Sequence, residues 1–291
     1  MLEARGLRGL VAPSLVALVM AGCGGGGDEA PPAEGGAPAA GAVTENPVDA
    51  ATAGSIRGTV KFTGTAPAAE KIDMSDEPTC ASSQGANAVR HTVMVGADGG
   101  LGNVFVYVKE GLDPALKFPA GEQVVLDQQG CEYHPHVMGL TAGESLKVKN
   151  SDALLHNINA TPTLNRGFNR SQPQQNMEFD VAFTTPEVMI PVRCDVHGWM
   201  EAYIGVTAHP YRTVTPEAGT FTLDRLPAGT YTLEAWHEKY GTQTQVVVVP
   251  ASGMVDVAFT FDASMAGRPV PMGPELVLDM HAGTARRASQ Q

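Results

Sequence analysis

The sequence is poor in positive charge. Its 291 residues include 19 Lys and Arg against 31 Asp and Glu, so the formal net charge is −12. Nucleic-acid binding requires a basic face, and this balance therefore argues against DNA or RNA as a partner. An acidic surface instead favours a basic partner protein. Hydrophobic residues make up 43% of the chain, which is enough to form a folded core.

The sequence also lacks helical periodicity beyond its N-terminus. The apolar stretch from Leu10 to Ala21 follows Arg5 and Arg8, and it is too short for a membrane-spanning helix. A positive region, an apolar stretch and small residues in succession predict a secretory signal peptide over residues 1–23.

The end of this signal, Met20-Ala21-Gly22-Cys23, resembles a bacterial lipobox. The resemblance implies a lipid anchor on Cys23. In a Gram-negative cell it also implies a place on the periplasmic face of the outer membrane or on the cell surface. The alternative is an ordinary signal peptide with a chance cysteine. Residues 24–54 are mostly Gly, Ala, Pro and acidic residues, a composition typical of a disordered, flexible tether.

Cysteine is scarce, with four in the whole chain. Secretion places the protein in an oxidising compartment, where spare thiols tend to pair. If Cys23 carries lipid, the odd number Cys80, Cys131 and Cys194 remains. A Cys80–Cys131 disulfide is favoured, because Cys194 has a separate use in a motif described below. Pairing of Cys194 with either of the other two stays open on spacing alone.

The middle of the chain predicts β-strands. Residues 145–150 alternate apolar and polar side chains, and a turn at residues 150–152 leads to a loop that carries His156. Residues 179–183 alternate in the same way, and an apolar strand at 188–192 leads to Cys194. With no convincing helix, these patterns predict an all-β fold.

The pair His156-Asn157, followed by a strand and then by Cys194-x-x-His197-x-x-Met200, resembles a cupredoxin of the plastocyanin and amicyanin kind. The resemblance implies a Greek-key β-sandwich, a blue copper domain at residues 122–206. It further implies one copper ion held by His156, Cys194 and His197 in a plane, with Met200 as the weak axial ligand.

Two neighbours of these ligands have expected roles. In the family, the Asn after the early histidine ties the two ligand loops together, which implies that role for Asn157. Trp199 is expected to cover the site and keep water away from it. The edge of His197 is the expected electron port, since the late histidine of cupredoxins lies near the surface. The alternatives are a cupredoxin fold without metal and a site filled by zinc, which accepts the same ligands.

Other histidines lack such a motif. His134 and His136 lie two residues apart on a predicted strand, so both side chains face one side of it. We expect them to be structural or surface residues. His91, His209 and His281 have no supporting cluster.

The C-terminal residues 207–265 contain AGTFTLDRLPAGTYTLEAWHEKYG, which resembles a carboxypeptidase-regulatory, transthyretin-like β-sandwich. Residues 55–121, with GSIRGTVKF and NVFVYVKEG, resemble the opening strands of the same family. Either one sandwich is split by the cupredoxin or two β-domains follow each other. Residues 266–291 are expected to form a loosely ordered tail.

Together these features predict a lipid-anchored extracytoplasmic blue copper protein that carries single electrons between redox partner proteins. An enzyme is not expected, because a metal with all four positions filled by side chains leaves no place for a substrate. One alternative is a binding or structural lipoprotein with Cys194 in a disulfide. Another is a copper chaperone or storage protein.

Overall fold

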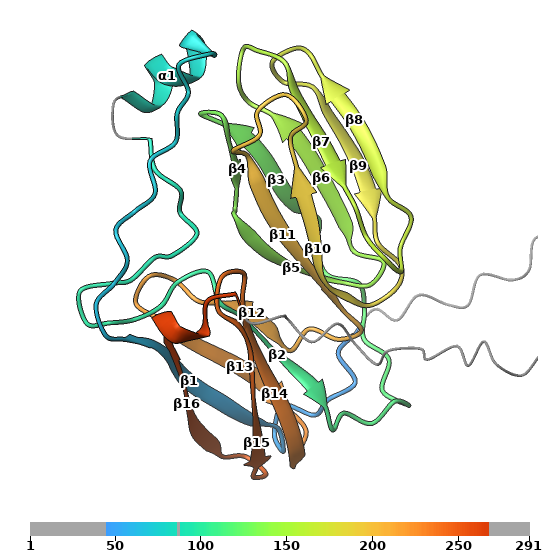
Figure 1. The fold of residues 1–291 in the computed structure, drawn as a ribbon. Coiled ribbons are helices and arrows are strands. Elements are labelled where there is room, and N and C mark those ends of the chain that lie inside the picture. The colour runs from blue at the N-terminus through green and yellow to red at the C-terminus, as the bar shows by residue number, and fades with distance from the viewer. Residues whose placement is uncertain (1–44, 86–87, 268–291) are drawn as a thin grey trace, which may run out of the picture. The chain divides into compact units, whose positions relative to one another are not determined.

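A computed structural model of the chain describes residues 45–85 and 88–267, and almost all of its regular structure there is β-strand (Figure 1). The predicted all-β fold class is confirmed. The predicted signal peptide with Cys23, residues 24–44 of the predicted tether and residues 268–291 of the predicted tail lie outside the described residues. Over the part that is described, no helix is long and apolar enough to cross a membrane.

The segment from residue 124 to residue 207 forms two sheets, with strand orders β5-β11-β10-β7-β8 and β4-β3-β6-β9. Strand β6 shows the alternation of a sheet with one buried face: Leu146 and Val148 are buried, and the residues on either side of Val148 are less so. Both sheets contribute side chains to a single hydrophobic cluster. The strands of these sheets are β3 (Val124–Gln129), β4 (Glu132–His134), β5 (Val137–Thr141), β6 (Ser145–Asn150), β7 (His156–Ala160), β8 (Phe168–Gln172), β9 (Glu178–Ala182), β10 (Glu187–Arg193) and β11 (Glu201–Thr207).

Two local expectations in this segment are wrong. His134 and His136 do not share a continuous strand, because β4 ends at His134 and β5 begins at Val137. Pro135 lies between them, and proline has no amide hydrogen to donate to a strand ladder. His156 is not in a loop but is the first residue of β7, so its side chain is oriented by a sheet.

A second pair of sheets combines strands from both sides of this segment. Strand β1 pairs with β13 and in parallel with β16, and β2 pairs with β14. The two sheets have the orders β13-β1-β16 and β12-β2-β14-β15 and share one hydrophobic cluster. Strands before residue 124 and after residue 207 therefore belong to the same sheets. They are β1 (Gly54–Thr63), β2 (Phe105–Glu110), β12 (Arg212–Val214), β13 (Thr220–Leu226), β14 (Gly229–His237), β15 (Gly241–Val249) and β16 (Met254–Asp262), and a 3-10 turn η2 (Ala263–Met265) follows.

One short helix, α1 (Pro78–Gln84), lies in the connection between β1 and β2. Pro78 occupies the first turn, where no amide hydrogen is needed, and the Glu77 carboxylate accepts a hydrogen bond from the Thr79 amide. Cys80 is its one buried residue. Sequence periodicity did not reveal this helix, because seven residues are too few to show a repeat.

Candidate metal centre

The strands bring three potential ligands to one end of the sheet β5-β11-β10-β7-β8. His156 begins β7, Cys194 directly follows β10, and residues 194–200 form the turn that connects β10 to β11. Strand β10 pairs with both β7 and β11. Because β7 and β10 run antiparallel, the start of one lies beside the end of the other.

The side chains converge. Nδ1 of His156 lies 3.0 Å from Nδ1 of His197, and that atom lies 3.8 Å from Sγ of Cys194. The three ligand atoms all lie within 4.8 Å of one another. The exposed fractions of His156, Cys194 and His197 are 0%, 3% and 2%, so the group is closed to solvent.

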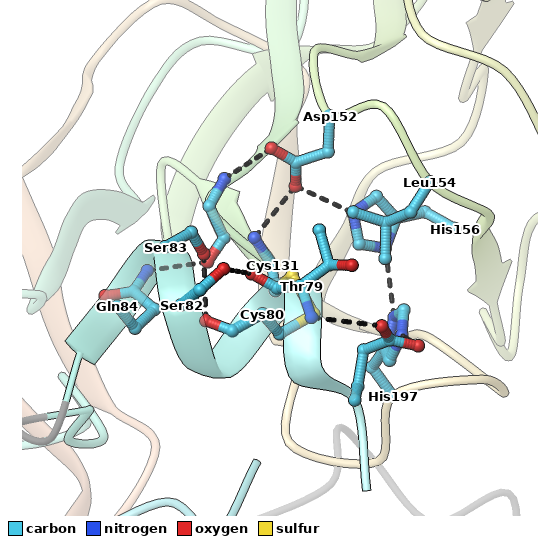
Figure 2. The surroundings of a disulfide bond; sticks show 12 residues. Thr79, Cys80, Ser82, Ser83, Gln84, Cys131, Asp152, Leu154, His156 and His197 are labelled. Carbon is cyan, nitrogen blue, oxygen red and sulfur yellow. Dashed lines mark hydrogen bonds and ion pairs between the residues drawn. A yellow bond between two sulfur atoms is a disulfide. The ribbon is translucent and has the colours of Figure 1, made fainter. Parts of the chain in front are cut away.

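Asp152 fixes which nitrogen of His156 faces this group. Its Oδ2 lies 2.8 Å from Nε2 of His156 and accepts the Cys131 amide hydrogen, while Oδ1 accepts that of Gly130 (Figure 2). A carboxylate can only accept, so the Nε2 of His156 is the protonated nitrogen and Nδ1 keeps its lone pair. A metal-ligating histidine is commonly held in this way by a carboxylate on its other nitrogen. Asp152 lies four residues before His156, but no spacing motif in the sequence predicted its role.

His197 is more enclosed than expected. Burial, and then the neighbouring His156, lower the pKa of His197, which favours the neutral imidazole. Its Nε2 lies 4.0 Å from Oε2 of Glu77, at the start of α1, and its ring centroid lies 5.1 Å from that of Trp199. The expected position of His197 near the surface is therefore wrong, because its side chain is buried and Glu77, far away in sequence, lies beside it. Its expected role as the electron port stays a prediction.

Cys80 and Cys131 form a disulfide, and Cys194 is a free, buried cysteine. Cys131 also lies near Asp152 and His156, but its sulfur is committed to the disulfide and offers no thiolate. Sγ of Cys194 accepts a hydrogen bond from the His197 amide at 3.4 Å.

The remaining predicted residues surround this group. Oδ1 of Asn157 accepts the Asp195 amide hydrogen at 2.9 Å and so joins the two ligand segments. Trp199 is half-buried and donates its indole hydrogen to the Cys131 carbonyl. Met200 is buried, and its backbone closes the turn through hydrogen bonds with Cys194 and His197.

The donor set fits a borderline or soft transition metal. At bond lengths of about 2.0 Å for imidazole and about 2.3 Å for thiolate, ligand atoms around one ion lie about 3–4 Å apart. The separations from Nδ1 of His197 to Nδ1 of His156 and to Sγ of Cys194, 3.0 Å and 3.8 Å, fall in this range. Two imidazoles and one thiolate suit copper or zinc, and they do not suit magnesium or calcium, which prefer oxygen.

Comparisons with known proteins give partial similarities to solved structures. A copper-containing nitrite reductase from Thermus scotoductus SA-01 matches at 16% identity over 34% of this chain, with a TM-score of 0.28, and only 25% of its own length is covered. An amicyanin mutant in the Cu(I) state matches at 14% identity over 34% of this chain and 100% of its own, with a TM-score of 0.27. A purple cupredoxin from Nitrosopumilus maritimus matches at 18% identity over 30% of this chain and 100% of its own, with a TM-score of 0.26. No family model matches the chain, and no curated protein matches it.

Proposed function

We propose that this protein is an extracytoplasmic blue copper protein, anchored through lipid on Cys23, that carries single electrons between redox partner proteins. The single observation that carries the proposal is the convergence of His156, Cys194 and His197 around a closed point, with Asp152 fixing the tautomer of His156. Met200 would complete the ligand set. Copper bound there would supply a one-electron couple.

The residues of the chain suit that role in three ways. The ligand turn is tied by backbone hydrogen bonds between Cys194 and Met200 and between Met200 and His197, so the ligands are held in place before any ion arrives. Burial excludes water from the donor atoms. Cys194 is also the one described cysteine outside a disulfide, which favours a ligand over a structural bridge.

The covered position of His197 changes the expected route of the electron. Its ring is in contact with that of Trp199, which is half-buried and borders a surface cleft. We propose that the indole of Trp199 connects the centre to the surface, in place of a bare edge of His197.

Residues 55–121 and 207–265, by their resemblance to transthyretin-like domains, would act as a scaffold or partner-docking module.

The test is an optical spectrum of the full chain loaded with Cu(II). We expect a strong visible band from thiolate-to-copper charge transfer, absent in Cys194→Ser and in His156→Gln. His209→Gln changes a half-buried histidine outside the centre and serves as the matched control that keeps the band. A colourless Cu(II)-loaded protein, or a band that survives Cys194→Ser, would contradict the proposal.

Two other functions have clear signatures. Zinc occupancy would give a colourless protein that retains one equivalent of metal lost in Cys194→Ser. A copper chaperone would release Cu(I) rapidly to a chelator, whereas an electron carrier with enclosed ligands would retain it.

A further inference from the structure

A surface cleft of about 280 Å³ lies beside the candidate metal centre, with Trp199 and Met200 among its lining residues. His91, His134 and His136 also line it, together with Glu132. His134 and His136 were expected to be structural or surface residues, and His91 was expected to have no supporting cluster. Three imidazoles and a carboxylate line this one small cleft, and none of them belongs to the ligand group at Cys194.

Glu132 stands between two of the imidazoles. Its Oε1 lies 3.9 Å from Nε2 of His91 and its Oε2 lies 3.7 Å from Nε2 of His134. Glu132 and His134 are two residues apart on β4, so their side chains leave the strand on the same face. His91 reaches the same carboxylate from the segment between α1 and β2. The two imidazoles thus come from separate parts of the chain, and each lies near one oxygen of the Glu132 carboxylate.

The two imidazoles are more exposed to solvent than the carboxylate. The side chains of His91 and His134 are 53% and 51% exposed, whereas that of Glu132 is 17% exposed. An ion from solvent can therefore reach both imidazoles, while the carboxylate lies deeper in the cleft. Neither separation is a hydrogen bond, so no strong contact between these side chains has to break. One contact does compete, since Nε2 of His134 lies 3.1 Å from the Gln129 carbonyl oxygen.

His136 differs from its neighbours because both of its nitrogens are engaged. Nδ1 lies 3.0 Å from the Glu201 carbonyl oxygen and Nε2 lies 2.9 Å from Oε1 of Glu238. It has no free lone pair to offer. Arg90, a cation in the same cleft, is already within 4.0 Å of the carboxylates of Glu70 and Glu201, and its charge is offset there.

We propose that His91, Glu132 and His134 form a second, solvent-accessible site for a divalent transition-metal ion, with imidazole, carboxylate and water as ligands. This set suits Cu²⁺, Ni²⁺ or Zn²⁺, and the general order of stability makes Cu²⁺ the strongest binder. It contains no thiolate, so it does not favour Cu⁺. The site shares no ligand with the centre at Cys194, so this proposal does not depend on the proposed electron-transfer function.

The test counts bound Cu²⁺ in the full chain, by titration and by electron paramagnetic resonance, after the first equivalent has saturated the buried centre. The same titration is repeated with Cys194→Ser, in which the buried centre lacks its thiolate ligand. We expect a further equivalent whose signal shows nitrogen coupling from two imidazoles. His91→Ala and His134→Ala should each weaken it by at least about tenfold, the scale of losing even a supporting group at a metal site, and Glu132→Gln should weaken it as well.

His136→Gln is the matched control, because it removes an imidazole from the same cleft and should leave the further equivalent in place. The proposal is overturned if the unmutated chain binds no Cu²⁺ beyond the buried centre. It is overturned equally if the signal carries only oxygen ligands, or if His136→Gln abolishes binding while His134→Ala does not. The mutated side chains of His91 and His134 are half-exposed, so their loss leaves the core intact.

Discussion

Asp152 and His156 form a hydrogen-bonded pair in which Oδ2 of the carboxylate lies 2.8 Å from Nε2 of the imidazole. The same carboxylate accepts the amide hydrogens of Gly130 and Cys131. Asp152 thereby links a proposed metal ligand to the loop that carries the disulfide, and the orientation of His156 depends on that loop.

Replacing Asp152 with Asn should weaken metal binding without removing a ligand. The amide still fits the space but lacks the charge that stabilises the protonated Nε2 of His156. Loss of such a supporting group typically costs about 10- to 100-fold in metal affinity. Competition with a chelator measures this. Asp127→Asn, a nearby carboxylate whose Oδ2 accepts from Ser151 and touches no proposed ligand, is the control. An unchanged affinity in Asp152→Asn would show that the pair does not support the site.

Removing the disulfide should destabilise the fold. The bond joins residues 51 positions apart, and a closed loop of that length stabilises a protein by up to about 4 kcal/mol through the entropy of the unfolded chain. Cys80→Ser combined with Cys131→Ser should therefore lower the free energy of unfolding by about 2–4 kcal/mol. Urea unfolding measures this, and the same shift is expected for the unmutated protein under reducing conditions.

The disulfide variant has a second expected effect at the centre. Cys80 lies in α1, and Glu77 at the start of α1 lies close to His197. With α1 no longer tied to the β3–β4 turn, His197 should become more accessible to a histidine-modifying reagent. His156, which is held by Asp152, should keep its protection. Equal labelling of His197 before and after removal of the disulfide would show that α1 is not what covers it.

Acid should destabilise the protein through His237. Burial lowers the pKa of His237 to about 4, and the charge of Glu238 opposes this only in part. In the unfolded chain the pKa returns to about 6.5. The folded state therefore loses stability as pH falls from about 6.5 to about 4, by roughly 3 kcal/mol from this group. His237→Phe should lower the stability at neutral pH slightly and flatten this acid limb in urea unfolding. If the free energy of unfolding of His237→Phe falls with decreasing pH as steeply as that of the unmutated protein, groups other than His237 cause the loss.

The sequence predicted the parts of the site that depend on local spacing. Cys194, His197 and Met200 lie in one seven-residue turn, and the strand that ends at Arg193 is visible as an apolar run. What the sequence did not predict comes from distant segments. Glu77, which lies close to His197, is at the start of α1, and the disulfide joins α1 to the β3–β4 turn. No periodicity in residues 70–90 carries that information.

The same distinction applies to the fold. Alternating residues predicted strands and hence the all-β class, but not which strands are neighbours. Strand β1 pairs with β16, nearly 200 residues later. The sequence was compatible both with one sandwich split by the cupredoxin-like segment and with two successive domains. His136 was misplaced for a different reason, because Pro135 separates the two strands that were predicted as one.

His136 should add a pH dependence of the opposite sign to that of His237. Burial opposes its charged form, but the hydrogen bond and charge of Glu238, aided by the Glu201 carbonyl and carboxylate, outweigh burial and raise the pKa of His136. A raised pKa means that the charged imidazole stabilises the folded state below the unfolded value of about 6.5. This contribution is lost as pH rises through the folded pKa.

Urea midpoints of the metal-free protein should therefore decline above about pH 6.5, and His136→Gln and Glu238→Gln should each flatten that decline. His91→Gln, a half-exposed histidine of the same cleft, is the control that should leave it unchanged. A decline that persists in both His136→Gln and Glu238→Gln would mean that this pair does not set the alkaline limit, because each variant removes the interaction on which the raised pKa depends.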